Sequence, residues 1–181
     1  FYDGSLNFIG RLRRRLQDNK EYRQASITVK WFVVSSGIED ILRETPLGEM
    51  ATEVFGCAFD YDSEGNAIAV KRAVSFTEKT KFLFAVNKGI SGDELRSNPY
   101  SVNDAVNDED RAVPFEYMVY IGDGPTDIPC FSMVKRLGGE SIGVVPPGGR
   151  DMKKPYQLAR GQRLTVGPYS ADYTDGSDLS K

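Results

Sequence analysis

The chain has 181 residues, of which 40% are hydrophobic and 27% are charged, and its formal net charge is −3. This length predicts a single domain over residues 1–181 with a substantial core. The slightly acidic balance argues against nucleic-acid binding, and the sequence has no run of about 18 apolar residues that predicts a membrane span. With no histidine, the chain has no histidine catalysis or histidine metal site. Cys57 and Cys130 match neither metal nor disulfide spacing, which favours a reducing, cytoplasmic location.

The first half of the chain alternates helical and strand patterns. Apolar residues recur at intervals of three and four over residues 5–19, which predicts an amphipathic helix. Residues 27–34 are β-branched and aromatic and predict a buried strand, and residues 38–43 predict a short helix. Strands over 54–60 and 67–74 flank the turn "DSEGN", which predicts a β-hairpin. The helix over 5–19 carries a basic cluster that we interpret as a solvated face: Arg11, Arg13, Arg14 and Arg15.

The second half continues the alternation. A helix is predicted over residues 77–88, ending at Gly89. The polar, turn-rich residues 90–113 predict an insertion at the rim of the domain. A strand at 115–121, a helix at 128–137 and a strand at 141–145 follow, and the tail from residue 155 is expected to hold a helix and a short strand at 163–166. Strands that alternate with helices predict a three-layer α/β fold with a parallel sheet.

Polar side chains follow the predicted strands at the places where α/β proteins bind ligands. Ser35 follows the strand at 27–34, a lysine lies near the start of the helix at 77–88, and Asp123 and Asp127 lie in "GDGPTD". Because Mg²⁺ prefers carboxylate and water oxygens, a hydroxyl, an ammonium and two carboxylates at these turns predict a phosphate and Mg²⁺ site. Asp127 begins the next helix, whose dipole favours its charge.

These segments carry a resemblance to a known family. "VVSSG", the lysine-bearing helix and "MVYIGDGPTDIPCF" resemble the second, third and fourth motifs of haloacid dehalogenase (HAD) superfamily phosphatases, in that order, and the resemblance covers residues 26–145. The hairpin is similar to that of phosphoserine-phosphatase-like members. The resemblance implies a Rossmann-like core, a small phosphorylated metabolite as substrate and Mg²⁺ as cofactor.

The resemblance also implies roles for individual residues. Ser35 is expected to hydrogen-bond a phosphoryl oxygen, with Ser36 and Gly37 contributing backbone amides. Asp123 is expected to ligate Mg²⁺, and Asp127 to orient the ligands and waters around it.

The family's lysine neutralises the charge of the phosphate and of the nucleophile. Two residues compete for this role. Lys79 lies in the first turn of the predicted helix, where the family places its lysine, and we favour it; Lys88 lies at the helix end, where "NKG" also resembles forms of the motif.

The family's first motif is missing from the sequence. It carries an aspartate nucleophile and a second aspartate two residues later, and it precedes the second motif. The string "AFDYDSEGN" has this spacing in Asp60 and Asp62, but it comes after the second motif, and we interpret it as a hairpin turn. A circularly permuted enzyme that uses Asp60 is the alternative.

The sequence therefore predicts most of a phosphatase without its nucleophile. We expect the nucleophilic aspartate, its strand and a helical cap to lie upstream, so that this chain alone is inactive. The complete enzyme would hydrolyse a phosphomonoester through an aspartyl-phosphate. The alternative is a catalytically inactive HAD-like binding or regulatory module.

Overall fold

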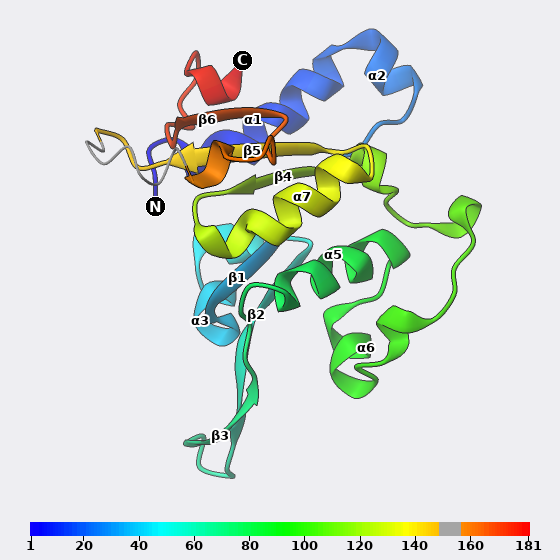
Figure 1. The fold of residues 1–181 in the computed structure, drawn as a ribbon, viewed down its shortest axis with the longest axis vertical. Helices are drawn as coiled ribbons and strands as arrows, with labels where there is room; N and C mark the ends of the chain where they lie inside the picture. The colour runs from blue at the N-terminus through cyan, green and yellow to red at the C-terminus, as the bar shows by residue number, and fades with distance from the viewer. Residues whose placement is uncertain (149–156) are drawn as a thin grey trace.

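The computed structural model describes residues 1–148 and 157–181, which form a mixed α/β fold with parallel strands (Figure 1). The described strands form two sheets of three strands each, in the orders β1-β2-β3 and β4-β5-β6. Their bounds are β1 (Phe32–Ile38), β2 (Glu53–Tyr61), β3 (Ala67–Arg72), β4 (Val119–Gly122), β5 (Glu140–Val145) and β6 (Val166–Ser170).

The first sheet joins a parallel pair to a hairpin. β1 is parallel to β2, and β2 and β3 are antiparallel, which confirms the predicted hairpin. In Figure 1 this hairpin projects from the body of the molecule. β1 begins later than predicted, at Phe32, because the chain before it leaves the sheet: the Ile27 N–H bonds to the Tyr22 carbonyl, and Ile27 is 48% exposed.

The second sheet is parallel throughout. β4 begins at Val119, because the apolar residues before it form a short 3-10 helix after Pro114, with Phe115 buried in the core. β6 lies three residues later than the strand predicted at 163–166. The expected tail helix falls partly outside the described residues. The single sheet expected from the sequence is thus found as two, and β3 is antiparallel.

The helices agree closely with the apolar periodicity. The helix predicted over 77–88 is α5, and Gly89 ends it at φ 75°, a backbone conformation that favours glycine. The insertion at 90–113 contains α6 and two 3-10 turns. Nowhere in residues 1–148 and 157–181 does a helix have the length and apolar character of a membrane span. The helix bounds are α1 (Ser5–Asp18), α2 (Lys20–Gln24), α3 (Glu39–Arg43), α4 (Pro46–Met50), α5 (Glu78–Lys88), α6 (Gly92–Ser97) and α7 (Ile128–Arg136), and the 3-10 helices are η1 (Ser101–Asn103), η2 (Asp108–Asp110), η3 (Phe115–Tyr117), η4 (Pro125–Asp127) and η5 (Asp178–Ser180).

Helix α1 packs beside the C-terminal segment (Figure 1). Arg11 donates to the Tyr173 carbonyl, and Arg15 donates to the Ser180 carbonyl at 2.7 Å and pairs with Asp175 at 2.8 Å. The interpretation of the arginine cluster as a solvated face is therefore incomplete: Arg15 is exposed as expected but is also bonded to the C-terminal segment, and Arg11 is partly buried against it. Both reach main-chain oxygens that lie more than 160 positions away in the sequence.

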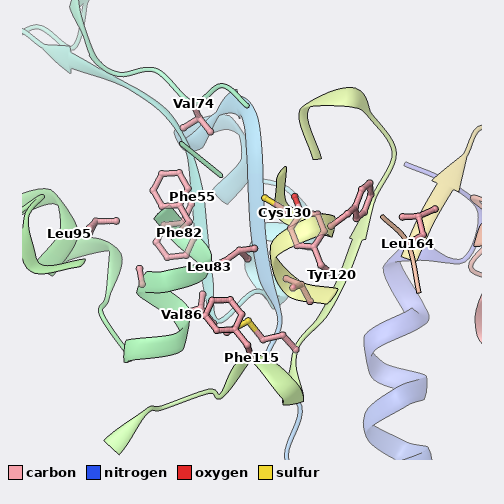
Figure 2. Close-up of a cluster of buried hydrophobic side chains, with 14 of the residues drawn as sticks. Phe55, Val74, Phe82, Leu83, Val86, Leu95, Phe115, Tyr120, Cys130 and Leu164 are labelled. Carbon is pink, nitrogen blue, oxygen red and sulfur yellow. The ribbon is translucent and has the colours of Figure 1, made fainter. Parts of the chain in front are cut away.

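One apolar core runs beneath both sheets (Figure 2). Phe55 of β2 stacks on Phe82 of α5 with ring centroids 4.7 Å apart, and Tyr120 of β4 meets Phe131 of α7 edge to face at 5.6 Å. Helices α5 and α7 pack together, with α5 also contacting β1 and α7 contacting β4 and β5. The helix layer therefore joins the two sheets.

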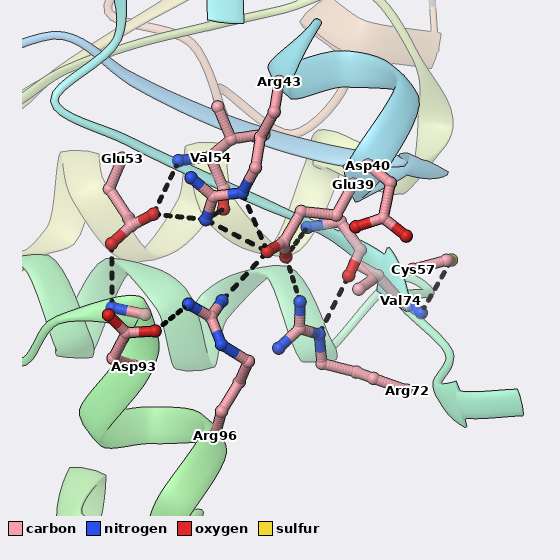
Figure 3. Close-up of polar contacts among 12 residues, drawn as sticks. Glu39, Asp40, Arg43, Glu53, Val54, Cys57, Arg72, Val74, Asp93 and Arg96 are labelled. Atoms are coloured by element: carbon pink, nitrogen blue, oxygen red, sulfur yellow. Dashed lines mark hydrogen bonds and ion pairs between the residues drawn. The ribbon is translucent and has the colours of Figure 1, made fainter. Parts of the chain in front are cut away.

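A buried carboxylate ties α3 to the hairpin and to the insertion (Figure 3). Glu39 is 4% exposed, and its oxygens accept from Arg43 and Arg96 at 3.0 Å each, from Arg72, and from the Gly56 N–H at 3.1 Å. The three arginines come from α3, α6 and β3. A buried charge is tolerated when it is paired and hydrogen-bonded, and three guanidinium groups meet this condition for Glu39.

Replacing this carboxylate tests how much the arrangement depends on it. Glu39→Gln keeps the size of the side chain and removes the charge that faces three arginines. We expect it to lower the free energy of unfolding by about 3 kcal/mol, since breaking one partner out of a buried ion pair leaves an uncompensated charge. Chemical denaturation of the full-length protein measures this, with the exposed Glu49→Gln as the control. Equal stability of both variants would contradict it.

Candidate functional site

A buried ion pair joins α5 to the loop after β4. Lys79 lies in the first turn of α5, and its Nζ is 2.7 Å from Asp127 Oδ1 and 3.2 Å from Thr126 Oγ1. The two charged side chains are only 7% and 6% exposed. Because both groups are shielded from water, their mutual attraction is stronger than that of an exposed pair.

Asp127 is held from further directions. The Tyr120 hydroxyl donates to Oδ1 at 2.7 Å, and the Gly124 N–H donates to Oδ2 at 3.0 Å. Burial, followed by the charge of Asp127, raises the pKa of Tyr120 well above its usual range, so the phenol stays protonated and acts as a donor. A side chain at Gly122 would lie 2.6 Å from Asp127 Cγ, so the glycine that ends β4 allows this carboxylate to approach.

Asp123 differs from Asp127 in lying exposed, directly after β4. The Tyr2 hydroxyl is 3.4 Å from Asp123 Oδ2. Burial and then the Asp123 charge raise the pKa of Tyr2, and burial followed by the same charge raises the pKa of Tyr173 to about 12. Neither tyrosine is predicted from the sequence, because neither lies near Asp123 along the chain and no spacing pattern connects them to it. Tyr120 is not predicted either, although the alternation of exposed and buried positions in β4 indicates that its side chain points inward.

Ser35, Ser36 and Gly37 lie in the second half of β1, so Ser35 falls within the strand and not after it as predicted, and the pairing with β2 becomes irregular there. The register passes from Val34 opposite Phe55 to Ile38 opposite Cys57, so β1 advances by four residues while β2 advances by two. Ser35 Oγ accepts the Gly37 N–H at 3.0 Å. Ser36 and Gly37 are exposed.

The predicted site residues are thus brought together only in part. Lys79 contacts Asp127, and Asp123 lies in the same loop; Ser35 is hydrogen-bonded within its own turn. Lys88, the alternative lysine, donates to the carbonyls of Val102 and Asp104 at 2.6 Å each and so faces the insertion. The geometry therefore places Lys79, and not Lys88, beside Asp127.

The "AFDYDSEGN" string forms the hairpin turn that the sequence predicts. Asp60 pairs with Lys71 across the two strands at 3.2 Å. Asp62 accepts the N–H groups of Glu64 and Asn66 at 2.9 and 2.8 Å. Hydrogen bonds, first that from the Asn66 side chain and then those from backbone N–H groups, lower the pKa of Asp62. The carboxylate of Asp62 is therefore occupied by its own turn.

No cluster of three or more His, Cys, Asp or Glu side chains suited to a metal occurs in the described part of the chain. Asp127 is buried and its oxygens are hydrogen-bonded, so Asp123 is the carboxylate at this site that faces solvent. It is a ligand of the kind that Mg²⁺ prefers, and Mg²⁺ is commonly held by only one or two protein carboxylates. Asp123 therefore fits as the one ligand that this chain would contribute to a Mg²⁺ ion.

Two strand edges flank the site. Within residues 1–148 and 157–181, β1 pairs only with β2, and β4 pairs only with β5. In Figure 1 β1 and β4 run in the same direction. Ser35 lies in β1 just after its regular pairing with β2 ends at Val34, and Asp123 directly follows β4.

Comparisons with known proteins give one relative. No family model and no solved structure matches the chain. A protein of Borreliella burgdorferi (strain B31), described as an uncharacterized protein, is 23% identical over 197 aligned residues. The alignment covers 99% of this chain and 64% of that protein, so the chain spans less than two thirds of the relative's length.

The buried pair predicts a coupled effect on stability. Lys79→Met leaves the Asp127 charge without its cation and is expected to lower the free energy of unfolding by about 3 kcal/mol or more, whereas Lys79→Met combined with Asp127→Leu is expected to cost less. Lys181→Met, which breaks an exposed pair with Asp178, serves as the control and should change little. Denaturation of all three variants measures the coupling. A double variant less stable than Lys79→Met would argue against it.

Cys130, in the first turn of the helix that follows Asp127, gives a second test. Burial raises the pKa of Cys130 to about 11, so its thiol is almost wholly protonated at pH 8 and hardly nucleophilic. We expect an alkylating reagent to modify the partly exposed Cys57 at least tenfold faster than the fully buried Cys130. Mass spectrometry of the two peptides measures both rates. In denaturant the rates should become similar; similar rates in the native protein would refute the prediction.

Proposed function

We propose that residues 1–181 belong to a Mg²⁺-dependent phosphomonoester hydrolase of the HAD superfamily, which acts through an aspartyl-phosphate on an aspartate outside this chain. The observation that carries the proposal is the buried Lys79–Asp127 pair beside the exposed Asp123 at the end of β4. It combines a fixed positive charge with a solvent-exposed carboxylate, the two kinds of group that bind a phosphate and its metal ion.

Lys79 stabilises the charge of the transferring phosphoryl group. Its ammonium has three N–H donors, of which two contact Asp127 and Thr126. The third remains for a phosphate oxygen or for the attacking carboxylate. Because Asp127 and the protein interior hold the ammonium in place, little reorganisation is needed when charge develops.

Asp123 supplies a carboxylate oxygen for Mg²⁺, with the remaining ligands coming from water, from the phosphate and from residues outside this chain. When bound, Mg²⁺ neutralises part of the charge on the phosphate. The role of Asp127 is to hold Lys79 and to shape the loop that presents Asp123, which agrees with its burial and its bonds to Lys79, Tyr120 and Gly124.

The unpaired edges of β1 and β4 in the described residues support the proposal that the nucleophile comes from a strand outside this chain. A strand that paired with both edges in parallel would end near Ser35 on one side and near Asp123 on the other. An aspartate at the end of that strand would face the phosphate held by Ser35, the amides of Ser36 and Gly37, and Lys79. The unpaired main-chain groups at these edges also favour such pairing.

Phosphatase assays of the full-length protein with para-nitrophenyl phosphate test the proposal. We expect Mg²⁺-dependent hydrolysis that falls at least about a hundredfold in Asp123→Asn, because a metal ligand is lost. Asp178→Asn, an exposed acid remote from the site, is the control and should keep full activity. Residues 1–181 alone should be inactive.

Three other outcomes separate the alternatives. Hydrolysis that survives in Asp123→Asn would reject the proposed site. No hydrolysis by the full-length protein, combined with Mg²⁺-dependent phosphate binding that Asp123→Asn abolishes, would favour an inactive binding or regulatory module. Loss of hydrolysis in Asp60→Asn alone would favour the permuted enzyme.

A further inference from the structure

A groove lies between α5 and the insertion, on a different face of α5 from Lys79. Its volume is about 670 Å³, within the range of small-molecule sites. Thr80, Phe84 and Lys88 line it from α5, and their spacing of four residues places them on one side of the helix. Lys79 does not line the groove; its ammonium is directed to Asp127.

The wall of the groove carries positive charge alone. Lys81, Lys88 and Arg111 line it, and none of the described residues that line it is an aspartate or glutamate. The whole chain has more acidic than basic residues, 26 against 23, and the insertion itself is rich in acids. The average composition therefore does not predict a wall that contains three cationic side chains and no acidic one. They create a local potential that attracts anions.

The two lysines have no carboxylate partner in the described part of the chain. Lys88 Nζ uses two of its three donors on the carbonyls of Val102 and Asp104, which fix it at the groove without neutralising it. Burial, and then the positive charge of Arg72, lower the pKa of Lys81. The Glu78 charge acts in the opposite direction, and the Lys81 Nζ lies 5.2 Å from the centre of the Phe82 ring, so an anion in the groove would add the close negative partner that this ammonium lacks.

Arg111 is held by the Asn87 side chain and partly neutralised by the exposed Asp108 carboxylate. Its Nη1 donates to the Asn87 side chain, and its Nε is 2.9 Å from an Asp108 carboxylate that is 96% exposed. An exposed pair of this kind is weak, since water screens it. The guanidinium thus keeps a positive face toward the groove.

Aromatic rings form the apolar part of the groove. Phe84 is 37% exposed and is held edge to face against Phe115, with centroids 5.3 Å apart. Tyr100 is 78% exposed. The ring of Phe84 is fixed by the core, whereas that of Tyr100 stands in solvent on the insertion, and both rings offer faces on which a flat group can stack.

We propose that this groove binds a small organic anion, whose phosphate or carboxylate group contacts Lys81 and Lys88 and whose flat apolar body packs against Phe84 and Tyr100. Such a ligand would contact both the cationic side chains and the aromatic rings that line the groove. The groove is distinct from the Lys79–Asp127 site, and ligand binding there does not depend on phosphatase activity.

Isothermal titration of the full-length protein with ADP, in EDTA so that no metal recruits it to Asp123, tests the proposal. Adenosine has the flat body without the charge, and inorganic diphosphate has the charge without the body. We expect ADP to bind at least tenfold more tightly than either, and its affinity to fall as salt is added. Lys81→Met and Tyr100→Ala are each expected to weaken ADP binding about tenfold, through loss of a charged contact and of a stacking surface.

Lys30→Met, an exposed lysine outside the groove, is the matched control and should bind ADP as the unaltered protein does. Thermal melting checks that the variants are folded; because Tyr100 is 78% exposed, Tyr100→Ala decides the result if Lys81→Met unfolds. No saturable ADP binding, binding equal to that of adenosine, or the same affinity in Tyr100→Ala as in Lys30→Met would overturn the proposal.

Discussion

The ion pair between Lys79 and Asp127 is the interaction on which the arrangement of this molecule depends. It connects the first turn of α5 to the loop between β4 and α7, while α5 contacts one sheet and α7 contacts the other. Two charges that are almost fully buried are tolerated only with good geometry, and Tyr120, Thr126 and the Gly124 amide supply the remaining hydrogen bonds. The pair therefore fixes how the ends of the two sheets meet.

This constraint also explains why Asp123 and Asp127, four residues apart, have different environments. Asp127 is buried and its oxygens are bonded to the protein, so it positions Lys79. Asp123 is exposed just after β4, where the Tyr2 hydroxyl, 3.4 Å from Oδ2, is a protein partner of its carboxylate. A second buried carboxylate, Glu39, holds α3, the hairpin and the insertion together in the same way, through arginines from each. The insertion is thereby fixed beside α5, where the cationic groove forms.

Local pattern was enough to predict the elements that short-range forces determine. Helices α1, α5 and α7 and the β2–β3 hairpin agree with their apolar period and turn residues, because these signals act within a few residues. The start of β4 was missed, because burial of Phe115 makes a 3-10 turn look like a strand in sequence. The pairs of Glu39 with Arg72 and Arg96 and the contact of Tyr2 with Asp123 join residues 33 to 121 positions apart, and no local pattern encodes such contacts. The division into two sheets depended on pairing at the edges of β1 and β4, which is equally non-local.

The most direct test of the account is to locate the phosphoryl group during turnover. The full-length protein would be mixed with ³²P-labelled acetyl phosphate and Mg²⁺, quenched in acid and digested, and the labelled peptide identified by mass spectrometry. The account predicts a hydroxylamine-sensitive phosphoryl group on an aspartate outside residues 1–181, with labelling lost in Lys79→Met or Asp123→Asn. A label on Asp60 or Asp62, or hydrolysis without any labelled aspartate, would contradict it.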